Sequence, residues 1–112
     1  MKKLPVTYEA IRELALTLPN TEESTSYGTP AIKVKGKLLL RLHDDGDKIV
    51  LKMPFDRRGE LMAEDPATYF ITDHYLNHPW VLVSLARVPA EALRDLLLIA
   101  HRAASPARKR RV

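Results

Sequence analysis

The chain has 112 residues, with 18 Lys and Arg against 14 Asp and Glu, and it contains no cysteine. This length suits one domain with a single hydrophobic core, and the lack of cysteine excludes disulfides, cysteine–zinc sites and thiol catalysis. Because no segment reaches the roughly 18 consecutive apolar residues of a membrane span, and no apolar run follows the charged N-terminus, we expect a cytoplasmic protein without membrane contact.

The formal net charge of +4 comes from a short basic run at the C-terminus, Arg108, Lys109, Arg110 and Arg111. Without these four side chains, the remainder of the chain has fourteen basic and fourteen acidic residues. Residues 33–58 nevertheless carry eight basic side chains against four acidic ones. This uneven distribution favours an oriented electrostatic surface. We divide the chain into one domain, residues 1–105, and a basic tail, residues 106–112.

A first helix is expected over residues 7–18, where apolar side chains recur at helical spacing. Thr7 is suited to cap its N-terminus, and Pro19 ends it. The polar and acidic stretch from Asn20 to Ser26 is then expected to be a loop.

Three strands are expected near residues 30–35, 37–43 and 48–53, because apolar and polar side chains alternate there. Tyr27-Gly28 and Lys35-Gly36 are predicted turns, since glycine adopts a positive φ without strain. In the second strand, the alternation places Leu38, Leu40 and Leu42 on one face and Lys37, Leu39, Arg41 and His43 on the other. The meander would thus have an apolar face and a cationic face.

A short helix is expected from Asp56 to about Glu64, followed by strands near residues 68–72 and 80–86. The last helix is expected to begin at Pro89 and to bury a stripe that runs from Leu93 to Ala104. The element order α-β-β-β-α-β-β-α predicts an α+β fold, with a five-stranded antiparallel sheet and helices packed on one face.

Two segments carry a family resemblance, Ser26-Tyr27-Gly28-Thr29-Pro30-Ala31-Ile32-Lys33-Val34-Lys35-Gly36-Lys37 and His78-Pro79-Trp80-Val81-Leu82-Val83-Ser84-Leu85. From about Tyr8 to Ala104, the chain resembles the MmcQ/YjbR family of small bacterial proteins. The resemblance implies the same element order in a fold similar to that of secretion chaperones. It also implies DNA binding through a double-wing arrangement.

The cationic face is the first candidate site, because ammonium and guanidinium groups on neighbouring strands can contact successive phosphates. A non-catalytic protein that binds DNA without sequence specificity is the function this predicts. The alternative is that the lysines only solvate an exposed sheet face. The candidate nucleic-acid-binding residues are Lys33, Lys35, Arg41, Lys48, Lys52, Arg57, Arg58, Arg108, Lys109, Arg110 and Arg111.

A pocket near Tyr27, Lys37, His74 and Trp80 is the second candidate site. Three of these side chains are amphipathic rings, which can line a site for a small anionic or peptide ligand, with Lys37 at its rim. The alternative is that the tyrosine and the tryptophan pin loops to the core. The sequence leaves both alternatives open.

No catalytic or cofactor-binding motif is recognisable in the chain, so we expect a binding protein without a cofactor and not an enzyme. No metal site is expected either, because Pro79 argues against a helix that would align His74 with His78. Leu98 and Ile99 widen the apolar face of the last helix, which predicts either a homodimer or cover by a neighbouring element.

Overall fold

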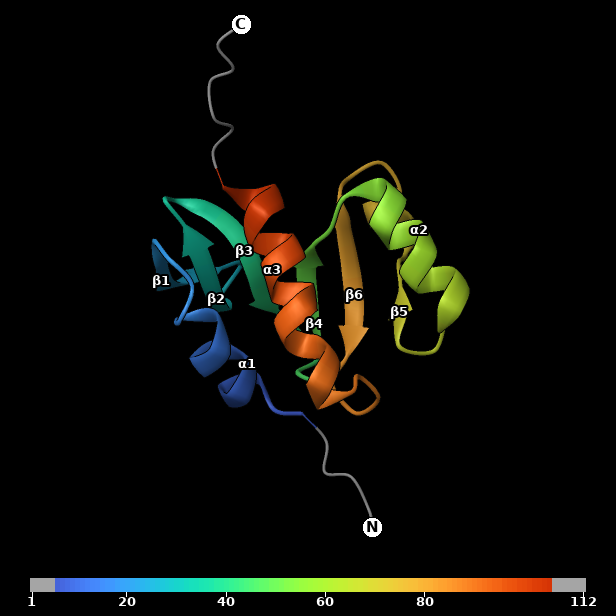
Figure 1. The fold of residues 1–112 in the computed structure, drawn as a ribbon, viewed down its shortest axis with the longest axis horizontal. Helices are drawn as coiled ribbons and strands as arrows, with labels where there is room; N and C mark the ends of the chain where they lie inside the picture. Colours follow the sequence, from blue (N-terminus) through green and yellow to red (C-terminus); the bar gives the residue numbers. More distant parts are fainter. Residues whose placement is uncertain (1–5, 106–112) are drawn as a thin grey trace, which may run out of the picture.

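The structure is a computed structural model that describes residues 6–105, and the basic tail of residues 106–112 lies outside the described residues (Figure 1). Its helices and strands are α1 (Tyr8–Ala15), β1 (Thr21–Ser26), β2 (Thr29–Val34), β3 (Lys37–Leu42), β4 (Lys48–Lys52), α2 (Phe55–Glu64), β5 (Tyr69–Phe70), the 3-10 helix η1 (Asp73–Tyr75), β6 (Trp80–Ser84), the 3-10 helix η2 (Ala90–Ala92) and α3 (Leu93–Ala104). The strands form one antiparallel sheet in the order β1-β2-β3-β4-β6-β5. The predicted α+β class is confirmed, with six strands where five were expected.

The additional strand is β1, which occupies the stretch expected to be a loop. It pairs with β2 along its whole length, from Thr21 opposite Val34 to Ser26 opposite Thr29. The two strands are joined by Tyr27 and Gly28, whose φ angles of 55° and 80° belong to the tight turn that matches the twist of a hairpin. β1 is an edge strand, which explains its polar side chains. Its backbone pairs with β2 on one side, and its other side faces water.

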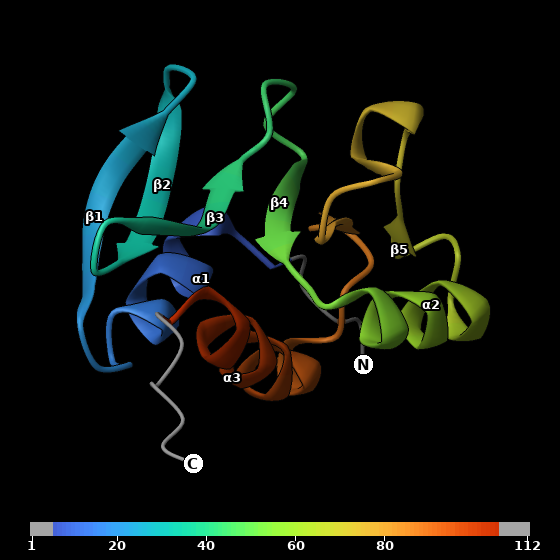
Figure 2. The same ribbon diagram turned by 90° about the horizontal axis from the view of Figure 1, so that it is seen from above.

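The helices lie together on one side of the sheet, opposite the β1–β2 and β3–β4 turns (Figure 2). In α1, the hydroxyl oxygen of Thr7 accepts a hydrogen bond from the backbone N–H of Ala10 at 3.1 Å, so the expected N-cap is confirmed. In α3, the expected stripe is buried, and it consists of Leu93, Leu96, Leu97, Ala100 and Ala104.

Two side chains of α3 were expected to widen its apolar face. Ile99 is half-buried and packs against the core, and Leu98 is 37% exposed. Cover by neighbouring elements therefore accounts for Ile99, and pairing of two chains through Leu98 stays a prediction. None of the helices within residues 6–105 has the length and apolar character needed to cross a membrane.

A β-bulge in β3 changes which side chains face the helices. Ile32 pairs with Leu40, but the next residue of β2, Lys33, pairs with Leu38, so Leu39 has no partner of its own. Leu39 and Leu40 both belong to the buried core. The expected strict alternation in this strand is therefore wrong, because one extra residue turns Leu38 to the same face as Arg41.

The alternation expected in β4 is confirmed. Ile49 and Leu51 lie in the core, and Val50 lies on the opposite face, where it is buried beneath other side chains. On that opposite face, the β1–β2 turn, the β3–β4 turn and the segment with η1 all project away from α3 (Figure 2). Side chains from these segments line a cavity over the middle strands.

The bulge is tested by placing a lysine at either of two neighbouring positions. Leu39→Lys puts an ammonium group into the core, where Leu39 is fully buried, and we expect a loss of about 4 kcal/mol in the free energy of unfolding. Leu38→Lys puts it on the half-buried opposite face, and we expect a loss of about 1 kcal/mol. Urea denaturation followed by circular dichroism measures both. The reverse ranking would show that β3 alternates regularly.

Candidate functional site

A cavity of about 500 Å³ lies on the face of the sheet away from α3, between the projecting turns. Five aromatic or imidazole side chains contribute to its wall, Tyr27, His74, Tyr75, His78 and Trp80. The other lining residues are Leu38, Arg41, Asp44 and Val50. We call this space the Arg41 cavity, because Arg41 is the one arginine or lysine that lines it among residues 6–105.

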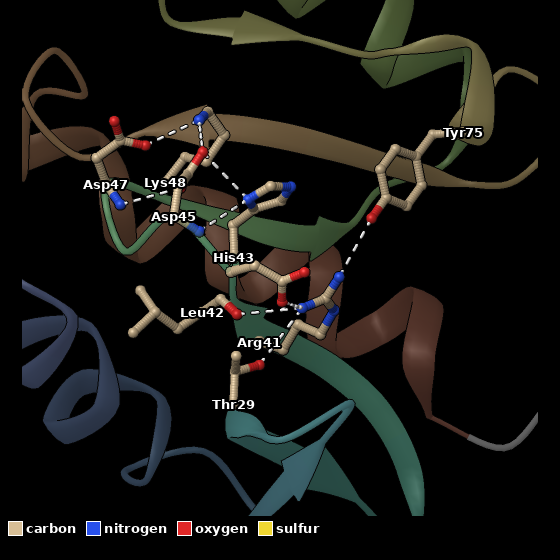
Figure 3. Close-up of polar contacts among 9 residues, drawn as sticks. Thr29, Arg41, Leu42, His43, Asp45, Asp47, Lys48 and Tyr75 are labelled. Carbon is tan, nitrogen blue, oxygen red and sulfur yellow. Dashed lines mark hydrogen bonds and ion pairs between the residues drawn. The ribbon is translucent and has the colours of Figure 1, made fainter.

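Arg41 is the penultimate residue of β3 and is only 8% exposed. Its guanidinium donates hydrogen bonds to the hydroxyls of Thr29 and Tyr75, both at 3.4 Å, and to the carbonyl of Leu42 at 3.2 Å (Figure 3). It also forms an ion pair with Asp44 at 3.4 Å, but the carboxylate side chain is 73% exposed. All four contacts are longer than the common N–H···O distance near 2.9 Å, so the charge is buried with long contacts around it.

Tyr27 and Trp80 stand at two sides of this cavity, and each ring faces a cation. The ring centroid of Tyr27 lies 5.2 Å from the Arg41 guanidinium, and the Trp80 centroid lies 4.8 Å from the ammonium of Lys52. Tyr27 is 86% exposed at the tip of the β1–β2 turn. Its ring therefore covers Arg41 from the solvent side and is not pinned to the core.

The wall of the cavity opposite β3 is held by a second buried arginine. Arg58 projects from α2 and is 7% exposed. Its guanidinium donates to four backbone carbonyls between η1 and β6, those of Tyr75, Leu76, His78 and Trp80, at 2.7–3.1 Å. These contacts fix the segment that carries His74, Tyr75 and His78 into the cavity.

Three of the four expected pocket residues meet in the Arg41 cavity, namely Tyr27, His74 and Trp80. Lys37 does not line it. The β-bulge separates Lys37 from the face that carries Arg41, and its side chain lines a second space near the end of α3. The expectation that Lys37 forms the rim of this pocket is therefore corrected.

The basic residues expected to form one cationic face lie in different surroundings. Arg41 and Arg58 are buried, Lys48 forms ion pairs with Asp45 and with Asp47, and Arg57 pairs with Glu60 on an exposed face of α2. Lys52 lies against Trp80. Lys33 is half-buried, and Lys35, with φ of 49°, belongs to the β2–β3 turn and not to a strand. The residues Arg108, Lys109, Arg110 and Arg111 lie outside the described residues.

The charge of Lys48 is compensated within the β3–β4 turn, apart from the Arg41 cavity (Figure 3). Hydrogen bonds to Asp45 and Asp47 raise the pKa of Lys48. Partial burial opposes ionisation of Asp45, but the hydrogen bonds from Lys48 and from the Asp47 backbone outweigh it and hold the pKa of that carboxyl well below its usual range. Lys48 thus stabilises the β3–β4 turn.

The sequence did not indicate the places of Tyr75 and His78 in the cavity, nor the pairing of Asp44 with Arg41. The only signal was the cluster of aromatic and imidazole residues between Asp73 and Pro79, and the spacing of these residues has no regular period. The carbonyl contacts of Arg58 that position this segment have no counterpart in sequence pattern. Among residues 6–105, no group of three or more metal-ligating side chains converges on one point.

Comparison with known proteins identifies the family of the chain. The sequence model of the YjbR family matches residues 16–103, so the chain belongs to the YjbR family, as the two motif segments led us to expect. The crystal structure of Deinococcus radiodurans protein DR2400, which carries a DUF419 domain, is similar at 25% sequence identity and a TM-score of 0.73. The similarity covers 90% of this chain and 80% of that one. No curated protein matches the chain.

The role of Arg58 is tested by removing its guanidinium. Arg58→Met leaves four carbonyls without their donors, and we expect a loss of about 3 kcal/mol in the free energy of unfolding. The adjacent Arg57→Met, which removes only an exposed ion pair, should cost about 0.5 kcal/mol or less. Urea denaturation measures both variants. Equal losses for the two would show that the carbonyl contacts do not hold the cavity wall.

Proposed function

We propose that this YjbR-family protein binds a small anionic ligand with a flat apolar part in the Arg41 cavity, without transforming it. The observation that supports this most directly is a buried guanidinium in the wall of a cavity of about 500 Å³. Small-molecule sites in proteins are typically concave and largely apolar, with a few polar groups that fix the orientation of the ligand.

The contacts of Arg41 favour an anionic partner. Burial of a charge is costly unless the charge is paired and hydrogen-bonded. The hydroxyls of Thr29 and Tyr75 are neutral, and the carboxylate of Asp44 is mostly in water. A carboxylate or phosphate group in the cavity would accept two N–H bonds from the planar guanidinium, a pairing that Arg makes better than Lys.

The rings around Arg41 favour a flat group attached to that anion. Trp80, Tyr75 and His78 line the same cavity, and aromatic faces stack well against planar apolar groups. Val50 and Leu38 add aliphatic surface beneath them. The site thus offers one charged contact and several apolar ones, which suits a small aromatic carboxylate better than a bare inorganic ion.

The proposal is tested with naphthalene carboxylate as the probe. Because Trp80 is the only tryptophan, its indole N–H gives a single cross-peak in a ¹H–¹⁵N spectrum. We expect this cross-peak to shift on titration with the carboxylate and to shift less with naphthalene methanol, its uncharged analogue. Arg41→Gln should weaken carboxylate binding about tenfold by calorimetry, as expected for loss of a hydrogen-bonded charge pair.

Three controls separate binding from stability. Arg57→Gln removes an exposed arginine outside the cavity and should leave the affinity unchanged. A thermal unfolding curve of Arg41→Gln shows whether the variant is folded at the temperature of the titration. His78→Ala is a third control, which changes the cavity wall and keeps Arg41 in place. Undiminished affinity in a folded Arg41→Gln variant, or equal binding of the uncharged analogue, would contradict the proposal.

The β2–β3 hairpin supports a second candidate function, contact with the phosphates of DNA. Lys35 and Lys37 are exposed on either side of Gly36, and neither forms an ion pair with a carboxylate of the described residues. Lys33 lies on the same hairpin. The arrangement suits weak contact with successive phosphates, and the basic tail would add to it. It lacks the Asn and Gln side chains that read base edges.

A salt titration of fluorescence anisotropy with labelled duplex DNA tests this second candidate. Lys35→Glu/Lys37→Glu should lower the log–log salt slope by about 1.8, because each phosphate contact contributes about 0.9. Arg87→Glu/Arg94→Glu reverses two exposed charges elsewhere and should leave the slope nearly unchanged. Loss of binding only when the chain ends at Ala107 would assign it to the tail, and no binding at low salt would exclude it.

A further inference from the structure

A second cavity of about 410 Å³ lies where β3 and β6 begin and β4 ends. Lys37 and Lys52 line it, together with the last two residues of α3 and Ser105, which follows them. The end of α3 lies beside these strand ends in Figure 1. The space therefore wraps around one end of the sheet, from the face that carries Arg41 towards the helices.

The two cavities share a boundary. Leu38 and Trp80 line both of them. Lys52 is the cross-strand partner of Trp80, and its ammonium lies 4.8 Å from the centroid of the indole ring. A molecule that lies along the indole in the Arg41 cavity would thus reach the lysines of the second cavity without leaving the surface.

The charges at the two ends of this path are alike. Of the described residues, those that line the second cavity include two lysines and no acidic side chain. Within residues 6–105, neither Lys37 nor Lys52 makes an ion pair with a carboxylate, whereas Lys48 makes two. The carbonyl of His101 near the end of α3 accepts hydrogen bonds from the backbone N–H and the hydroxyl of Ser105, at 2.9 and 2.7 Å, which reduces its attraction for those ammonium groups.

From this continuity we infer that the ligand is an elongated dianion. One anionic group pairs with Arg41, the flat apolar middle lies along Trp80, and the second anionic group lies between Lys37 and Lys52. The inference rests on the proposed function of the Arg41 cavity and extends it to the chemical class of the ligand. Trp80 is then the shared wall that spaces the two charges.

The test compares two probes by calorimetry on the full chain, naphthalene carboxylate and a naphthalene dicarboxylate with its two carboxylates at opposite ends. We expect the dicarboxylate to bind about tenfold more tightly, since each partly exposed ion pair adds a factor of about three. Lys37→Gln/Lys52→Gln should remove this advantage and leave the affinity for the monocarboxylate unchanged. Lys33→Gln/Lys35→Gln removes two charges outside both cavities, and it should keep the advantage.

The outcomes distinguish the inference from the proposal beneath it. If the monocarboxylate binds through Arg41 but the dicarboxylate binds no more tightly, the inference of a dianionic ligand is wrong and the proposed binding function of the Arg41 cavity stands. The same conclusion follows if the advantage persists in Lys37→Gln/Lys52→Gln. If neither probe binds, both are overturned.

Discussion

The extra residue in β3 decides which side chains meet in this protein. Leu39 and Leu40 both enter the core beneath the helices, although they are neighbours in a strand. Leu38 and Arg41 therefore share the opposite face, and both line the same cavity. With regular alternation, Leu38 would point into the core and Leu39 would replace it beside Arg41. Bulges commonly re-aim side chains near functional sites in this way, and here the core and the cavity depend on the same insertion.

Two buried arginines differ in their partners, and the difference bears on the roles that we propose for them. Arg58 donates to four carbonyls at 2.7–3.1 Å, so its charge is well solvated by backbone dipoles and its position is fixed. Arg41 has only contacts of 3.2–3.4 Å in its hydrogen-bond shell, and it borders a cavity. A buried charge with short contacts stabilises a fold, whereas one with long contacts at a cavity still gains from a further partner. This contrast is why we propose ligand binding for Arg41 and a structural role for Arg58.

Sequence patterns predicted what depends on neighbours along the chain. The cap at Thr7, the turn at Gly28 and the buried stripe of α3 all follow from local spacing, and each is present in the structure. The strand β1 was missed because its pairing uses backbone groups, to which its polar side chains give no clue. The displacement of Lys37 from the expected pocket was missed for a related reason, since a bulge is a property of the pairing between two strands and not of one strand's composition. The three rings of that pocket were predicted together because each is amphipathic, although no local spacing links His74 to Tyr27 or to Trp80.

In the folded chain, the positive charge that is available to a ligand lies in other places than the sequence suggested. Residues 33–58 have twice as many basic as acidic side chains, which suggested one broad cationic face. In the folded chain, Asp45 and Asp47 compensate the charge of Lys48, and backbone carbonyls surround Arg58, so neither adds to such a face. Around Trp80, the cations that remain among the described residues are Arg41 in the wall of the first cavity, and Lys37 and Lys52 in the wall of the second, with the ammonium of Lys52 against the indole ring. Since two separated charges with a flat ring between them select a ligand by length and shape as well as by charge, this arrangement favours recognition of a particular small molecule over general attraction to a polyanion.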